Sequence, residues 1–95
     1  MTLAEIAANI QRGLTSSTFS DSLKFDCGTD GVIVLADKQA SLKDAETDCT
    51  IKISTDNLAK LIAGKLNPMT GVMMGKLKVS GDATIALRLG QLLKA

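Results

Sequence analysis

The 95-residue sequence has no histidine, tryptophan or tyrosine, and it has only two phenylalanines, two cysteines and two arginines. Without histidine, neither a Ser-His or Cys-His nucleophile pair nor the commonest zinc ligand is available. Without arginine clusters and stacking aromatic rings, the chain lacks the groups that bind nucleic acids. We therefore expect neither an enzyme nor a protein that holds a metal or cofactor, and we expect no nucleic-acid partner.

Long hydrophobic runs are also missing. No apolar stretch approaches the roughly 18 residues of a membrane-spanning helix. The N-terminal stretch MTLAEIAANIQRGL contains Glu5, whereas a signal peptide begins with basic residues and continues with uninterrupted apolar ones. We expect residues 1–95 to form a single domain that stays in the compartment in which it is made.

The shortage of aromatic residues predicts an aliphatic core. Hydrophobic residues make up 45% of the chain, but Phe19 and Phe25 are the only aromatic ones. Cys27 and Cys49 fall on the apolar positions of alternating stretches, where a small buried hydrophobic residue is expected. We interpret both as reduced core residues rather than as a disulfide or a redox pair.

Charge is divided along the chain. Residues 21–56 contain eight acidic residues and four lysines, whereas residues 57–95 contain six basic residues and a single acid. The basic part permits contact with an anionic membrane surface, although scattered charge that keeps the protein dissolved explains the same pattern. Asp44, Glu46 and Asp48 alternate at an expected strand edge, and we interpret them as solvated charges rather than as a catalytic carboxylate pair.

Hydrophobic periodicity predicts the order of the elements. Residues 3–14 repeat with a helical period, Thr2 and Glu5 have the spacing of a capping box, and Gly13 marks the expected end, followed by a polar loop. The period then changes to two, which predicts sequential antiparallel strands with one buried and one wet face. These strands are expected over SLKFDC (22–27), VIVLAD (32–37), ASLKDA (40–45), DCTIKIS (48–54) and KLKVSGD (76–82).

Three further helices complete the pattern. An apolar stripe that begins after Ser54-Thr55-Asp56 ends at Gly64, and a short helix starts with Asn67 as cap and Pro68 in its first turn. The stretch ATIALRLGQLLKA is the last helix. The order is helix, four strands, two helices, strand and helix, which predicts an α+β fold with one sheet and helices on one face.

The stretch GKLNPMTGVMMGKLKVSGD contains two Gly-Lys-Leu tripeptides but is not a phosphate-binding loop. Gly71 lies four rather than five residues before Gly75, and Leu77 stands where a hydroxyl residue is required. The unusual feature is a surplus of flexible apolar side chains, which suit a site for varied ligands and also occur in ordinary cores. They are Met69, Val72, Met73 and Met74.

Residues 48–89 resemble the sterol carrier protein type two domain, also called the non-specific lipid-transfer protein domain. The resemblance is carried by three motifs in order, which are DCTI (48–51), GKLNP (64–68) and GKLKVSGD (75–82). It implies a five-stranded, mostly antiparallel sheet with helices on one face and a hydrophobic tunnel between them. Such a tunnel binds fatty acids, fatty acyl-CoA, sterol-like molecules or phospholipids.

The resemblance also implies which residues contact the lipid. The tunnel would be closed by the segment after Pro68 and by the last helix. Many relatives carry aromatic residues and a glutamine where this chain has Val72-Met73-Met74, which indicates a purely apolar grip. The implied lipid-binding residues are Met69, Val72, Met73, Met74, Ile85, Leu89, Leu92, Leu93, Phe25 and Ile33.

The function implied by the resemblance is non-catalytic binding and intracellular transfer of lipids. The alternative is an accessory or scaffold subunit that presents a lipid substrate to a lipid or isoprenoid-quinone biosynthetic complex. The chain ends in Leu93-Lys94-Ala95, which is not a peroxisomal address, and the expected location is the cytoplasm of a bacterium.

Overall fold

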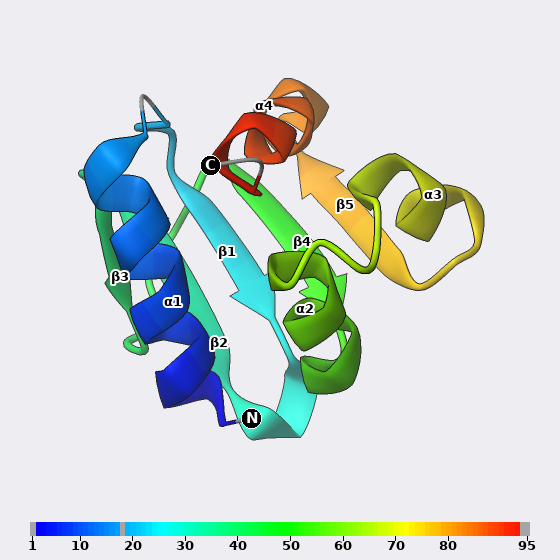
Figure 1. The fold of residues 1–95 in the computed structure, drawn as a ribbon, viewed down its shortest axis with the longest axis horizontal. Helices are drawn as coiled ribbons and strands as arrows, with labels where there is room; N and C mark the ends of the chain where they lie inside the picture. Colours follow the sequence, from blue (N-terminus) through cyan, green and yellow to red (C-terminus); the bar gives the residue numbers. More distant parts are fainter. Residues whose placement is uncertain (1, 18, 94–95) are drawn as a thin grey trace.

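The computed structural model describes residues 2–17 and 19–93, in which one sheet is accompanied by helices in the predicted order (Figure 1). A short 3-10 turn, η1, follows the first strand and was not predicted. The elements are α1 (Leu3–Ser16), β1 (Leu23–Asp26), η1 (Gly28–Asp30), β2 (Val32–Ala36), β3 (Gln39–Ser41), β4 (Cys49–Ile53), α2 (Thr55–Ile62), α3 (Pro68–Met73), β5 (Leu77–Gly81) and α4 (Ala83–Leu93).

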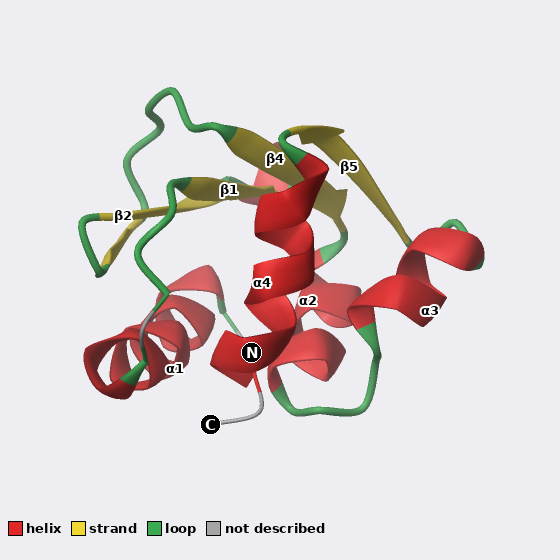
Figure 2. Cartoon of the chain, turned by 90° about the horizontal axis from the view of Figure 1, so that it is seen from above, coloured by secondary structure: helices red, strands yellow, loops and turns green. Residues whose placement is uncertain are grey.

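Helices cover only one face of the sheet, as the alternating strands predicted (Figure 2). Strand β4 illustrates the cause, because Ile51 and Ile53 are buried under the helices while Lys52 between them is exposed. A strand that alternates in this way can bury one face and leave the other in water. The α+β class is therefore confirmed.

The strands lie in the order β3-β2-β1-β4-β5. Strands that follow one another in the sequence were expected to pair antiparallel. Strands β1 and β4 instead pair in parallel, with Phe25 opposite Ile51. All other pairs are antiparallel, so the sheet is mostly antiparallel. The parallel pair arises because the chain leaves β3 at one edge and returns on the far side of β1.

The return crossing replaces most of a predicted strand. The strand expected over 40–45 ends at Ser41, and residues 42–48 form a connection on the face of the sheet opposite the helices (Figure 2). Lys24 on this face lies 2.6 Å from Asp44, measured from Nζ to Oδ1. The acidic residues of this segment are exposed, as expected, but they lie in a loop rather than on a strand edge.

Helix α1 confirms one predicted boundary and corrects the other. The Thr2 N–H donates to Glu5 Oε1 at 3.1 Å and the Glu5 N–H donates to Thr2 Oγ1 at 3.2 Å, which is the predicted capping box. The helix does not stop at Gly13 but continues to Ser16. Leu14 is 1% exposed, and its burial outweighs the cost of about 1 kcal/mol for a glycine inside a helix.

Each Gly-Lys-Leu tripeptide follows a helix and has the same local form. Gly64 after α2 and Gly75 after α3 have φ angles of 77° and 72°, in the left-handed region that glycine adopts without strain. The lysine of each tripeptide is exposed and the leucine is buried. The repeat is therefore a helix ending used twice, and the second copy leads into β5.

The layer between sheet and helices is apolar throughout the described residues, in which no polar or charged side chain is buried. Cys27 and Cys49 are free and buried, which confirms them as core residues, and burial raises the pKa of both thiols. Most of the remaining members of the cluster come from the strands and from α1, α2 and α4, and include Ile6, Ile10, Leu23, Phe25, Ile33, Leu35, Ile51, Leu58, Leu61, Ile85 and Leu89.

Strand β5 ends at Gly81, which pairs with Cys49 of β4. Its φ is 83°, and a Cβ at this position would collide with the Asp48 carbonyl oxygen. The same oxygen accepts a hydrogen bond of 2.9 Å from the Asp82 N–H at the start of α4. Gly81 thus sets both the register of β5 and the position at which α4 begins.

We expect Gly81→Ala to destabilise the protein more than the matched change Gly75→Ala. Both glycines have positive φ, which costs a side chain about 1 to 2 kcal/mol. Only Gly81 also lacks space, and this adds about 1 to 3 kcal/mol for displaced backbone. Urea unfolding of the two variants measures the difference, and equal free energies of unfolding would contradict the close approach.

Candidate functional site

The structure brings together four of the predicted lipid-binding residues. Phe25 of β1 and Ile33 of β2 form part of the buried sheet face, and Ile85 and Leu89 of α4 pack in the same cluster. Their exposed fractions are between 0% and 2%. These four side chains therefore lie in the layer between sheet and helices, where the tunnel was expected. Leu92 and Leu93 also belong to α4, but their side chains fall outside the part that the structure describes.

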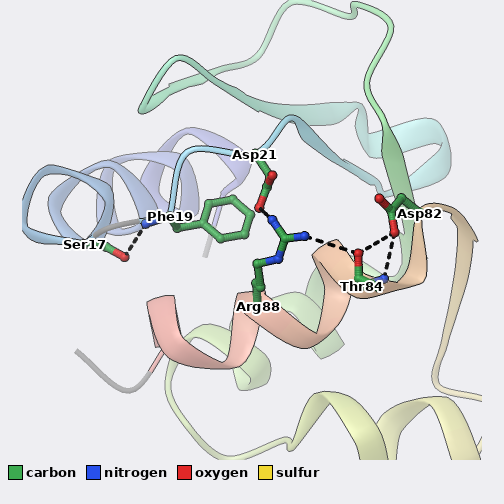
Figure 3. Close-up of polar contacts among 6 residues, drawn as sticks. All are labelled: Ser17, Phe19, Asp21, Asp82, Thr84 and Arg88. Carbon is green, nitrogen blue, oxygen red and sulfur yellow. Dashed lines mark hydrogen bonds and ion pairs between the residues drawn. The ribbon is translucent and has the colours of Figure 1, made fainter.

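Helix α4 is held by polar contacts on its outer side (Figure 3). An Asp82 oxygen accepts hydrogen bonds from the Thr84 N–H at 3.0 Å and from the Thr84 hydroxyl at 2.5 Å. These bonds hold the pKa of the Asp82 carboxyl below its usual value. One turn later, Arg88 Nη1 donates to Asp21 Oδ2 at 2.7 Å, which joins α4 to the segment before β1.

The other four predicted residues, in α3 and at its C-terminal end, face away from the core. Met69, Val72, Met73 and Met74 are 58%, 46%, 86% and 61% exposed. In this structure they form no wall of the apolar layer, and their contact with lipid stays a prediction. Sequence periodicity gave no indication of this direction, because α3 has only six residues.

Helix α3 faces the core with a glycine instead of an apolar side chain. Gly71 is buried, and a Cβ on it would lie 2.9 Å from Leu77 Cδ2 and 3.7 Å from Leu66 Cδ1. Asn67 caps the helix with Pro68 in its first turn, as predicted. Because the glycine takes the only inward position, the methionines and Val72 are left outside.

The sequence did not indicate an open pocket of about 510 Å³ at one end of the sheet. The ends of β1 and β4 and the beginning of β5 line it, with Asp26 and three lysines. Lys52 and Lys78 are cross-strand neighbours on the outer face, and their like charges favour a nearby anion. The sequence signal that could have revealed Lys52 and Lys78 is their outward position in the stretches 48–54 and 76–82, both predicted as strands.

The described residues contain neither a candidate metal site nor a helix that could span a membrane. Residues 2–17 and 19–93 contain no group of three acidic, cysteine or histidine side chains that could hold a metal ion. Over the same residues, every helix is too short or too polar to span a bilayer. The arrangement with the clearest chemistry is therefore the apolar layer beside α4, together with the exposed helix α3.

Comparison with known families fits this arrangement. Residues 2–94 match the model of the SCP-2 sterol transfer family. The chain belongs to this family. Membership confirms the resemblance seen in the three motifs.

Individual SCP-2 relatives extend the comparison. Sterol carrier protein 2 of Gallus gallus is 43% identical over 49 residues, which are 52% of this chain and 9% of that protein. The matched segment is thus about a tenth of that relative's length. Among solved structures, the Aedes aegypti sterol carrier protein 2 in complex with palmitate has a TM-score of 0.78 and 19% identity, covering 94% of this chain and 91% of that one.

A second solved SCP-2 structure connects the fold to another setting. The protein described as "UbiJ-SCP2 Ubiquinone synthesis protein" has a TM-score of 0.71 and 19% identity, covering 96% of this chain and 91% of that chain. At these identities the two solved structures establish a shared fold. The five-stranded α+β architecture is therefore that of SCP-2 domains.

We expect Leu89→Ala and Met73→Ala to differ sharply in their effect on stability. Leu89 is fully buried, so its truncation costs about 2 to 5 kcal/mol of unfolding free energy. Met73 is 86% exposed, so its truncation changes that free energy by less than about 0.5 kcal/mol. Urea titrations measure both values, and a large loss for Met73→Ala would show that α3 packs inward in solution.

We expect acid to weaken the start of α4 through Asp82. The folded pKa of this carboxyl lies below the unfolded value of 3.8, so its contribution is complete above 3.8 and is lost as the pH falls through the lower folded pKa. Asp82→Asn keeps a capping oxygen without the titrating charge. The measurement is unfolding free energy from pH 6 downwards, and the acid-induced loss should be smaller in Asp82→Asn than in the original protein.

Proposed function

We propose that the chain is a non-catalytic lipid carrier that holds the hydrocarbon part of its ligand in the layer between the sheet and α4. The observation that carries this proposal is the wholly apolar character of that layer in the described residues, in a chain of the SCP-2 family. Each buried methylene of a ligand would contribute about 0.8 kcal/mol. The proposed contacts are Phe25, Ile33, Ile85 and Leu89, with Leu92 and Leu93 further along α4.

Ligand binding in this layer requires movement of a helix, because Ile85 and Leu89 already fill the space against the sheet. The exposed ion pair between Arg88 and Asp21 contributes only about 0 to 1 kcal/mol. Helix α3 contacts the core through Gly71, which offers little apolar area. We infer that the ligand enters between α3 and α4, the two helices at the β5 end of the fold.

The proposed site selects its ligand through the hydrocarbon part and not through the head group. Within the described residues no buried polar side chain is available to bind a head group. Fatty acid, fatty acyl-CoA, sterol-like and phospholipid ligands all satisfy this requirement, and the palmitate complex of the Aedes aegypti relative favours a fatty acid. We propose that residues 1–95 act as one lipid-binding domain in the cytoplasm of a bacterium and exchange lipid with anionic membranes.

A second candidate is an accessory subunit that presents an isoprenoid-quinone precursor or another lipid to biosynthetic enzymes. The observation that favours it is the shared fold with the ubiquinone synthesis protein. Affinity purification from cells distinguishes the two functions. Stable recovery of biosynthetic enzymes supports the subunit, whereas a free monomer that moves lipid between vesicles supports the carrier.

We expect the purified protein to take up a fluorescent fatty acid, with one ligand bound per chain and displacement by unlabelled fatty acid. Leu89→Asp should abolish this uptake, because binding the hydrocarbon chain would require an unpaired carboxylate to lose its water. Leu87→Asp is the matched control on the same helix and should retain uptake, since Leu87 is 58% exposed.

Circular dichroism accompanies both variants, and the neutral change Leu89→Asn replaces Leu89→Asp if the latter does not fold. Native mass spectrometry of the original protein then provides an independent measurement of bound lipid. An original protein that contains no lipid and takes up no fatty acid would contradict the carrier function. Equal uptake by the Leu89 and Leu87 variants would move the site away from α4.

A further inference from the structure

The exposed apolar surface of the protein is concentrated on one short segment. Of the six large hydrophobic side chains that are exposed within the described residues, four lie between positions 69 and 74. Figures 1 and 2 both show α3 at the β5 edge of the sheet, on the opposite side of the molecule from α1. A contiguous apolar patch on a projecting element marks a contact surface rather than part of the core.

The chain on both sides of this segment carries only basic charged residues. Residues 57–81 contain four lysines and no aspartate or glutamate. All four are exposed, and Lys65 and Lys76 flank α3 directly on its two sides. Exposed methionines with exposed lysines before and after them in the chain therefore complement a layer with negative charge outside and hydrocarbon beneath.

We propose that α3 is the membrane-docking element, which enters the interface of an anionic lipid bilayer. The side chains of Met69, Val72, Met73 and Met74 lie among the outer acyl carbons, and the flanking lysines extend to the lipid phosphates. This inference rests on the proposed lipid-carrier function and identifies the surface at which the carrier meets its donor and acceptor membranes.

The same charge pattern argues against a second copy of the chain as the occupant. A twofold dimer through α3 would place Lys65 and Lys76 of each protomer against an equally basic surface of the other. Helix α4 is the other apolar helix at this end, but its Ile85 and Leu89 are buried against the sheet. Helix α3 is therefore the element that can insert without unfolding the core.

The local structure suits α3 to this role. Glycines with positive φ stand on either side of it, at Gly64 and Gly75, and Gly71 alone fills its inward position. The helix can therefore place all of its large side chains outward without leaving a cavity behind. Docking through α3 also brings the proposed ligand entrance between α3 and α4 to the membrane surface, so that a lipid passes without crossing water.

The test is flotation of the purified protein with vesicles of phosphatidylglycerol or of phosphatidylcholine. The original protein should float with the anionic vesicles and much less with the neutral ones, and high salt should reduce the effect. Met73→Asp should weaken binding to phosphatidylglycerol by about tenfold, since it removes an exposed apolar side chain that would insert into the bilayer and adds a negative charge. Leu42→Asp is the matched control, because Leu42 is also exposed but lies in the loop on the far face of the sheet.

The charge contribution is tested by Lys65→Gln and Lys76→Gln. Each should weaken binding to anionic vesicles by about fivefold, and the double variant by their product. Uptake of a fluorescent fatty acid from solution is measured in parallel. The two lysine variants and Leu42→Asp should retain it, because their side chains are exposed and belong to neither the predicted nor the proposed lipid contacts.

Four results would overturn the docking proposal. Equal vesicle binding by the Met73→Asp and Leu42→Asp variants would remove α3 from the membrane contact. No flotation of the original protein, or its dimerisation through α3 in light scattering, would assign the surface to a protein partner. Loss of fatty acid uptake in Met73→Asp would make α3 part of the ligand site instead. If the original protein takes up no fatty acid, the proposed carrier function is contradicted. The flotation result then still decides whether α3 contacts a membrane.

Discussion

The helices of the described chain gather on one face of the sheet because that face carries most of the buried apolar side chains, whereas the outer face carries lysines beside the buried Val34. The buried positions of the central strands carry only aliphatic residues, phenylalanine or cysteine, while Lys24 and Lys52 occupy outward positions between them. A helix placed on the outer face would have to bury these lysines. The whole arrangement, including the position of α4 over the sheet, follows from this one-sided burial.

An interior without buried polar or charged side chains in the described residues would also allow the domain to exchange its own contacts for those of a ligand. Leu89 and Ile85 interact with the sheet through non-directional contacts, which a hydrocarbon chain can replace at similar free energy. A buried polar network would have to be broken at a cost of several kcal/mol. The polar contacts that do hold α4, from Asp82 and Arg88, lie on its outer side and survive small shifts of its apolar face.

Helix α3 separates two tasks that a single apolar surface could not perform. Its buried Gly71 permits close packing against Leu77, and its large side chains remain outside. The interior is left to the proposed ligand, and the exterior is available for contact with a lipid surface. Both properties depend on a glycine at the one inward position, where a Cβ would lie 2.9 Å from Leu77 Cδ2 and would force this side chain to shift.

Local features of the chain were determined by the sequence itself. The capping box at Thr2 and Glu5, the Asn67-Pro68 helix start and the order of helices and strands depend on residues within one or two turns of each other, so periodicity and spacing reveal them. Three motifs sufficed to indicate the family. Only the tertiary structure decided the parallel pairing of β1 with β4, the short β3 and the outward methionines. These depend on contacts between distant residues, such as Gly71 with Leu77 and Phe25 beside Ile51, which no local pattern contains.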